Sequence, residues 1–294
     1  MKFRTEITLP AAGFTISHPD QVMTTGSCFA ENISERMLQG GFTVDVNPLG
    51  IVYNPASVAG SLQDLIRRRT YTEADLFLHE GVYHSFSHHS RFSGADSRAV
   101  LEKINASIAH SSAFLRKANL LIITFGTAHV YRRVSTGQVV SNCHKRPARE
   151  FEEQRLTVEQ ITEQWNGLIR DLQALNSGLK ILFTVSPIRH WKDGAHANQL
   201  SKAILLLAVN ELVQSNAQCY YFPAYEIVLD DLRDYRFYAA DLVHPNSQAV
   251  DYIWEKFGEV YFDKCTRELV MEYEKRHKQM CHVKRLGHQP AEGK

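Results

Sequence analysis

The sequence predicts an α/β fold in which a parallel β-sheet is covered by helices on both faces. Five short runs are apolar and rich in strand-forming residues, and helical stretches separate most of them. These runs are residues 21–25, 42–46, 120–125, 180–185 and 218–222. Such alternation is typical of parallel strands joined by crossover helices.

Residues that could take part in chemistry follow directly after several of these runs. They are Ser27, Gly50, Thr127, Ser186 and Arg189. In open parallel sheets, ligands bind at the carboxyl ends of the strands. We therefore predict a functional site at this edge of the sheet.

The first run ends at Gly26 and Ser27, where the sequence predicts a tight turn into an amphipathic helix. The apolar residues that follow have a spacing close to four, until two glycines stop the helix. They are Phe29, Ala30, Ile33, Met37 and Leu38. The free amides and positive dipole end of this helix would face an oxyanion that forms at Ser27.

The remaining elements divide the chain into two predicted parts. Residues 1–265 form the α/β domain, in which a His-, Ser- and aromatic-rich insertion at about 70–98 could cover the cleft. A helix over 99–116 leads into the third strand, and Pro245 starts another helix. From about residue 266 the chain is highly charged, which predicts an exposed helix and a frayed tail over 266–294.

Asp241 and His244 supply the other half of a possible catalytic group. A serine hydroxyl needs a histidine to take its proton and a carboxylate to hold that histidine in the right tautomer. Pro245 biases His244 away from helical geometry, so both residues are expected on a loop. We predict Ser27, Asp241 and His244 as a catalytic triad.

The separated motifs together resemble those of the GSCFA-domain proteins, which are similar to SGNH (GDSL-like) hydrolases. The resemblance spans about residues 20 to 260, and its blocks are 26–30 (GSCFA), 47–50 (NPLG), 125–129 (FGTAH), 142–145 (NCHK), 186–190 (SPIRH) and 241–245 (DLVHP). It implies a flavodoxin-like three-layer α/β/α sandwich with a mostly parallel central sheet, and hydrolysis of acyl esters. It also places the nucleophile on Ser27 rather than on the neighbouring Cys28.

The sequence departs from the SGNH pattern where an asparagine of a Gly-x-Asn-Asp block usually donates to the oxyanion. Here the block reads Gly126-Thr127-Ala128-His129. The replacement donor is then Thr127 or His129, or a residue of another loop such as Asn54 or Asn142. The backbone amides of Ser27 and Gly50 are plausible partners. Loss of one such donor costs about 10²- to 10³-fold in rate.

Several polar residues near the strand ends either bind the acyl or sugar part of a substrate or hold the loops together. The predicted substrate-binding residues are Asn54, His129, Asn142, His144, Arg189 and His190, and Asn198 and Lys202 could reach the same rim. The histidines at 79–89 lack the spacing of a zinc motif, so we predict neither a metal nor an organic cofactor.

Composition limits the partners of the protein. The formal net charge is +1, which gives no reason to expect nucleic acid or an anionic membrane. The N-terminus lacks the apolar core of a signal peptide, and five cysteines without paired spacing argue against a disulfide framework. These features favour a cytoplasmic protein.

The sequence thus predicts a serine hydrolase that cleaves a short acyl group, such as acetyl, from a carbohydrate or related metabolite. If an alcohol intercepts the acyl-enzyme in place of water, the same residues make an acyltransferase. A third possibility is a catalytically silent binding module that keeps the hydrolase fold, since a fold by itself does not settle function.

Overall fold

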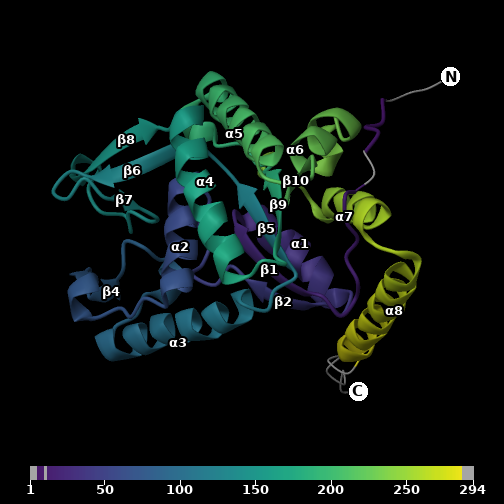
Figure 1. Ribbon diagram of the computed structural model, residues 1–294, viewed down its shortest axis with the longest axis horizontal. Helices are drawn as coiled ribbons and strands as arrows, with labels where there is room; N and C mark the ends of the chain where they lie inside the picture. The colour runs from purple at the N-terminus through teal and green to yellow at the C-terminus, as the bar shows by residue number, and fades with distance from the viewer. Residues whose placement is uncertain (1–4, 10–11, 287–294) are drawn as a thin grey trace, which may run out of the picture.

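A five-stranded parallel sheet forms the centre of the protein. The computed structural model describes residues 5–9 and 12–286. The strands are β1 (Gln21–Gly26), β2 (Thr43–Val46), β5 (Leu120–Phe125), β9 (Lys180–Val185) and β10 (Cys219–Tyr221), in the spatial order β10-β9-β5-β1-β2. All four pairings are parallel (Figure 1). This is the strand order of flavodoxin-like proteins, and the predicted fold class is confirmed.

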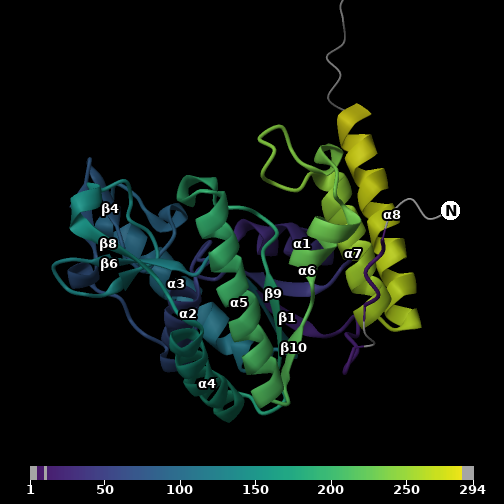
Figure 2. The same cartoon turned by 90° about the horizontal axis from the view of Figure 1, so that it is seen from above.

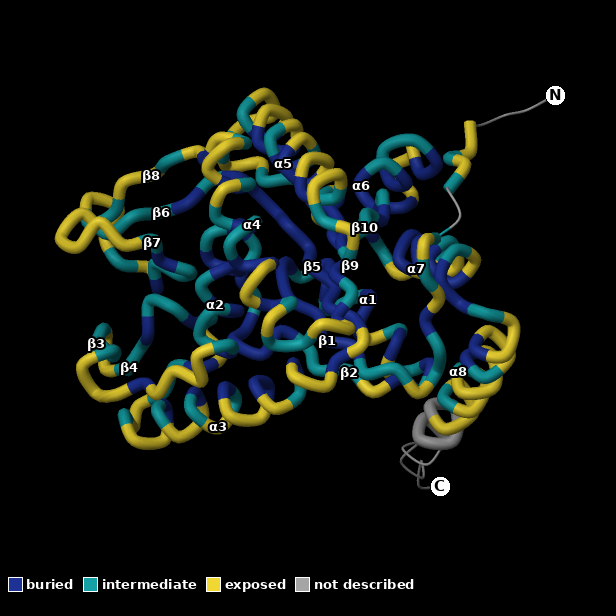
Figure 3. Tube along the Cα trace, in the orientation of Figure 1, coloured by how far each residue is buried: buried dark blue, intermediate teal, exposed yellow. Residues whose placement is uncertain are grey.

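Helices cover both faces of the sheet, as Figure 2 shows. Helices α2 (Pro55–Arg67), α3 (Ser97–Leu115), α4 (Val158–Leu175) and α5 (Ala195–Ser215) lie on one side, and α1 (Cys28–Gln39) and α7 (Ser247–Tyr261) lie on the other. Successive strand residues point to opposite faces. Val22 accordingly joins the core under α1 and α7, whereas Met23 joins the core under α2 to α5. The three central strands, β1, β5 and β9, are therefore buried on both sides (Figure 3).

A second sheet, which the sequence analysis did not predict, occupies residues 129–155. It consists of β6 (His129–Arg133), β7 (Val139–Val140) and β8 (Phe151–Arg155), paired antiparallel in the order β7-β6-β8. Its strands are largely polar and only partly buried, so they lack the apolar runs that marked the main sheet. Figure 1 shows it at the left, away from the C-terminal helix.

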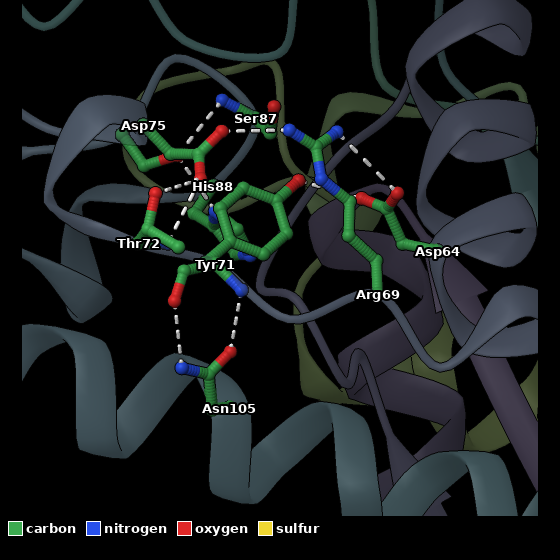
Figure 4. A network of polar contacts seen from close by, with 9 residues as sticks. Asp64, Arg69, Tyr71, Thr72, Asp75, Ser87, His88 and Asn105 are labelled. Carbon is green, nitrogen blue, oxygen red and sulfur yellow. Dashed lines mark hydrogen bonds and ion pairs between the residues drawn. The ribbon is translucent and has the colours of Figure 1, made fainter.

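The insertion at 70–98 forms a hairpin, β3 (Phe77–His79) with β4 (Val82–His84), between 3₁₀ turns at Glu73–Asp75 and Ser90–Phe92. Tyr71 ties it to the helices of the main domain (Figure 4). The Tyr71 hydroxyl donates to Asp64 of α2 at 2.6 Å, and the backbone of Tyr71 bonds twice with the Asn105 side chain of α3. The insertion is therefore a fixed part of the fold.

His88 of the insertion is a structural histidine. It is fully buried, its Nδ1 lies 2.9 Å from Ser85 Oγ, and its ring meets the Tyr71 ring edge-on at 4.7 Å. Burial lowers the pKa of His88 to about 3, so the ring is neutral at physiological pH. These contacts give His88 a packing role within the insertion.

After β10 the chain forms α6 (Ala224–Glu226), a π-helix over Ile227–Asp231, a 3₁₀ turn over Tyr235–Phe237, and then α7. The last helix, α8 (Lys264–Leu286), is exposed along most of its length, but its first turns pack on the domain. Val270 is buried, and Trp254 Nε1 donates to Glu274 at 2.9 Å. The predicted tail at 287–294 lies outside the described residues.

The backbone at Gly26 leaves no room for a side chain. Its φ is +138°, and a Cβ there would lie 2.2 Å from Thr124 O of the neighbouring strand. We expect Gly26→Ala to lower the free energy of unfolding by about 2 kcal/mol or more, because both the backbone strain and the clash must be relieved. Urea denaturation measures the loss.

Gly60→Ala is the matched control. Gly60 lies inside α2, and a Cβ added there would have open space, with no atom within 4 Å. A methyl group at this position is expected to raise stability by about 0.5–1 kcal/mol through helix propensity. Equal stability of the Gly26→Ala variant and the native protein would show that the β1–β5 junction tolerates a side chain.

Candidate active site

Ser27 lies at the carboxyl end of β1, where the chain turns into α1. It is the N-cap of α1, and its Oγ accepts a hydrogen bond from Phe29 N at 3.3 Å. Only 5% of the residue is exposed. The positive end of the helix dipole therefore faces the hydroxyl. The same geometry is that of an ordinary N-cap, so the position alone does not assign a chemical role.

Asp241 and His244 form the predicted acid–base pair. Asp241 Oδ2 accepts from His244 Nδ1 at 2.6 Å, while Oδ1 accepts from the amides of Val243 and His244 at 3.0 Å each. The amide hydrogen bonds, chiefly that of His244, and the imidazole together lower the pKa of Asp241 to about 2. The carboxylate thus stays ionised at neutral pH and fixes the imidazole with Nε2 away from it.

The loop that carries this pair is held by its own backbone. Ala239 N donates to His244 O at 2.7 Å, and Leu242 adopts a positive φ of 60° that lets the chain turn back. About half of each functional side chain is exposed, 51% for Asp241 and 47% for His244. The pair is therefore ordered internally but lies at the surface.

The structure does not join Ser27 to His244. Among the described residues, no hydrogen bond links Ser27 Oγ to the imidazole. The His244 loop lies at the same edge of the sheet as Ser27, because Leu242 and Val243 border the same hollow as Arg189, which follows β9, and Ser27 follows β1. The Asp241–His244 contact of the predicted triad is thus in place, and the serine contact is open.

Two predicted oxyanion donors are occupied. Ser27 N donates to Thr124 O at 3.1 Å, and Gly50 N donates to Asn47 O at 2.8 Å. An amide committed to a backbone carbonyl is not directed at an oxyanion, so the structure does not support these two amides in that role. The Thr127 hydroxyl is also engaged, with Ser201 Oγ at 3.0 Å.

The backbone amide of Thr127 differs from the other two. Within the part of the chain that the structure describes, Thr127 N has no hydrogen-bond acceptor. Thr127 follows β5, the strand next to β1, and is itself 4% exposed. An N–H without an acceptor is uncommon in a nearly buried residue, and it leaves the Thr127 main chain as a predicted donor that remains available, together with the side-chain amide of Asn142.

A pocket of about 510 Å³ opens beside Thr127, between the carboxyl edge of the main sheet and the small sheet. Three aromatic rings and a larger number of polar and charged side chains line it. The lining includes five predicted residues: Asn54, Thr127, His129, Asn142 and His190. His89 of the insertion also lines this pocket. Ser27 and His244 do not line it.

The predicted pocket residues differ in how free their side chains are. Asn54 caps α2 through Ser57 N at 2.8 Å, and His129 Nδ1 lies 2.7 Å from Glu153 Oε1. Asn142 accepts from His144 N at 2.8 Å. Burial, with smaller effects from Lys202 and other nearby cations, lowers the pKa of His190 to about 4, so this ring is neutral.

His144 and Arg189 do not line this pocket. The His144 ring bonds Ser85 O at 2.8 Å, which ties the 142–145 segment to the insertion, and burial lowers its pKa to about 4. Arg189 borders a separate hollow of about 210 Å³ with Trp191 and Leu242. Their predicted substrate-binding role therefore has no support from the pocket, and His144 holds loops together instead.

Lys202 of α5 is fully buried behind the site. Its Nζ donates to Gly126 O and to Ser186 O, each at 2.6 Å. One turn earlier, Asn198 Oδ1 accepts from His190 N at 3.0 Å. Both residues were predicted near this rim, and in the structure they hold the loops after β5 and β9.

Several pocket residues were not predicted. Tyr53, Tyr131 and Lys192 line the pocket, and Lys192 Nζ donates to the Tyr131 hydroxyl at 2.6 Å. Tyr131 belongs to the unpredicted small sheet. Tyr53 directly precedes Asn54 in the same connection to α2, and it could have been found from its place beyond a strand end.

Cys28 is the alternative nucleophile, and its environment does not activate it. Desolvation is the main cause that raises the pKa of the Cys28 thiol, so the thiolate is disfavoured. Among the described residues, no group of three or more His, Cys, Asp or Glu side chains is placed to hold a metal ion. Likewise, none of the described helices has the length and apolar character needed to cross a bilayer.

The sequence model of the GSCFA family matches residues 21–257, which is most of the chain. The chain belongs to the GSCFA family. The five residues that spell the name begin at Gly26 and cover the turn from β1 into α1. A search of curated protein sequences gave no match.

Two solved structures resemble this GSCFA protein over most of its length. One is a family 3 carbohydrate esterase from Clostridium thermocellum, 9% identical with a TM-score of 0.39. The other is a family 3 carbohydrate esterase from Talaromyces cellulolyticus, 11% identical with a TM-score of 0.38. Each comparison covers 86% of this chain and 99% of the other. At this level of similarity, they do not establish what the GSCFA protein acts on.

The buried position of Lys202 predicts a pH-dependent contribution to stability. Desolvation lowers its pKa from 10.5 to about 7. Between these values the folded protein has released the proton that the unfolded chain still binds, so the free energy of unfolding rises with pH. We expect the native protein to gain stability relative to Lys202→Met between about pH 7 and about pH 10 in urea denaturation. A difference that stays constant over this range would contradict the prediction.

Proposed function

We propose that this protein is a serine esterase, with Ser27 as nucleophile, His244 as base and Asp241 as the carboxylate that orients the base. The observation that carries the proposal is the Asp241–His244 hydrogen bond of 2.6 Å. Because Nδ1 donates to the carboxylate, Nε2 is the nitrogen left to accept a proton. No cofactor is needed for this chemistry.

In the proposed reaction, His244 Nε2 takes the Ser27 proton as Oγ attacks the ester carbonyl. The C–O bond to the leaving alcohol then breaks, with the proton returned from His244 to that alcohol. Water, deprotonated by His244, attacks the acyl-enzyme and releases the acid and free Ser27. Thr127 N is the donor that we assign to the oxyanion in both steps, because its hydrogen is uncommitted.

His244 must approach Ser27 for this reaction, since the structure shows no bond between them. The two residues differ in how firmly the fold holds them. Ser27 is fixed between β1 and α1, whereas the His244 loop is half exposed. We infer that this loop closes on the bound substrate, which is a common way for enzymes to complete a catalytic group.

The substrate that we propose is a short acyl ester of a carbohydrate or related metabolite. The pocket volume of about 510 Å³ is within the range of small-molecule sites. Tyr53, Tyr131 and Phe151 offer apolar faces, and Asn142 and Lys192 offer hydrogen bonds along its wall. This combination suits the C–H faces and hydroxyl groups of a sugar ring.

A catalytically silent binding module is the competing function. The open Ser27–His244 contact and the occupied amides of Ser27 and Gly50 favour it. The same pocket would then only recognise its ligand.

A fluorophosphonate probe separates the two functions. We expect one covalent adduct by intact mass on the native protein and none on Ser27→Ala, together with hydrolysis of a short-chain aryl ester that falls about 10³-fold or more in the variant. Cys28→Ala is the matched control and should keep both properties, because its thiol is not activated. A folded native protein with neither adduct nor turnover would support the binding module.

Asp241→Asn tests the orientation of the base. The amide cannot stabilise the imidazolium, so we expect kcat for the aryl ester to fall about 10-fold or more, with little change in stability because the pair is exposed. Asp230→Asn, an exposed carboxylate paired with Arg233, is the control and should leave kcat unchanged. Unaltered kcat in Asp241→Asn would remove Asp241 from the mechanism.

A further inference from the structure

Lys202 is a buried cation in an unusual setting. Its ammonium has no carboxylate partner within ion-pair distance among the described residues, and the side chain is fully buried. Its two acceptors are the main-chain carbonyls of Gly126 and Ser186. A buried charge without a counter-ion is costly, so a purely structural hydrogen bond could be made at lower cost by a neutral side chain.

The Gly126 carbonyl belongs to the same peptide unit as the Thr127 N–H, the amide without an acceptor. Gly126 O and Thr127 N–H are part of the same peptide group, which is trans. In a trans peptide the C=O and N–H bonds point in opposite directions. Because Gly126 O faces Lys202, the Thr127 N–H points away from it, and Thr127 lines the substrate pocket.

The charge also affects how strongly this amide donates. A cation bound to the carbonyl oxygen draws electron density from the peptide, and hydrogen bonds linked in this way strengthen one another. Lys202 thus acts on the opposite end of the group that the oxyanion would meet. This peptide lies in the segment Gly126-Thr127-Ala128-His129, which stands where SGNH hydrolases have the Gly-x-Asn-Asp block.

The second carbonyl fixes the distance between two loops. Ser186 follows β9, and the same segment leads to His190, which lines the pocket. Because Nζ donates to both Gly126 O and Ser186 O, it holds the segments that follow β5 and β9 at a fixed distance from each other. The peptide that carries Thr127 N–H therefore cannot rotate without breaking a bond to a buried ammonium.

We propose that Lys202 is a positioning residue that holds the Gly126–Thr127 peptide with its N–H directed to the oxyanion and strengthens that N–H as a donor, in place of the missing asparagine. This inference rests on the proposed esterase function. Lys202 does not touch the substrate in this arrangement, and it acts only through the peptide group.

The first test compares kcat and KM for a short-chain aryl ester in the native protein and in Lys202→Met. A donor that acts on the oxyanion stabilises the transition state more than the bound substrate. We therefore expect kcat to fall about 10- to 100-fold in the variant with KM nearly unchanged, less than the loss of a whole donor. Leu205→Ala, which opens a cavity elsewhere on the buried face of α5, controls for general loosening and should retain kcat.

The second test is the pH profile of kcat, which a merely structural lysine would not shape. The neutral amine keeps two N–H donors for the two carbonyls but loses the charge. Since burial lowers the pKa of Lys202 to about 7, kcat should fall on the alkaline side in the native protein, and Lys202→Met should lack this fall.

The groups around Lys202 do not produce the same effect. Burial lowers the pKa of His190 to about 4 and raises the pKa values of Cys28 and Tyr225, so all three are neutral near pH 7. Arg189 contributes to the low pKa of Lys202 and is unchanged in Lys202→Met. An alkaline fall that depends on Lys202 is therefore assigned to its own ammonium.

The outcomes distinguish the two proposals. If the native protein shows Ser27-dependent turnover but folded Lys202→Met has the same kcat within twofold, the role of Lys202 is overturned and the esterase function stands. If kcat falls in the variant with the same alkaline profile as the native protein, Lys202 only supports the fold, and the inference is again wrong. If the native protein shows no Ser27-dependent turnover, the esterase function fails and this inference fails with it.

Discussion

The close approach of β1 to β5 at Gly26 is the constraint on which the rest of the site depends. The absence of a side chain at Gly26 lets its backbone lie against Thr124 O, and Ser27 N then bonds that same carbonyl. This contact lies where the order of the parallel strands reverses, the place at which open α/β sheets bind ligands. One short contact therefore fixes where α1 begins, which way Ser27 Oγ faces, and how near it lies to the Gly126–Thr127 peptide.

The acid–base pair is built on a different principle. Asp241 and His244 are organised by hydrogen bonds within a short loop, and they depend little on the core. An exposed pair of this kind contributes little to stability. The hydrogen bond from Nδ1 nevertheless fixes the imidazole ring, with Nε2 facing away from the carboxylate. In the proposed reaction a preformed acid–base pair approaches a fixed serine, so the movement required is that of one loop.

Sequence reasoning located the main sheet well and the details of the site less well. The runs at 120–125 and 180–185 coincide with β5 and β9, because fully buried parallel strands are continuous apolar segments. The small sheet escaped prediction because its strands are polar and partly exposed. The Asp241–His244 contact was predicted from residue type and spacing along the chain, and the structure contains it. The hydrogen bonds that occupy the amides of Ser27 and Gly50 could not be predicted, because every residue type except proline has the same backbone N–H. Asn54 and His144 were found as polar residues near the site, but their hydrogen bonds to Ser57 and Ser85 depend on tertiary contacts.

In the proposed arrangement, a buried lysine supports a main-chain donor to the oxyanion, and this differs physically from donation by an asparagine side chain. A side-chain amide donates directly and is neutral at every pH, whereas the Thr127 amide donates from the main chain and gains its strength from a charge that can be lost. The fold bears the cost of that charge, because desolvation disfavours the ammonium throughout the folded state. The stability that the protein loses by keeping Lys202 protonated and the strength that the peptide gains as a donor are thus two effects of the same proton. A rise in pH through the pKa of Lys202 therefore stabilises the fold and weakens the donor, as expected of a functional group that a fold keeps against its own stability.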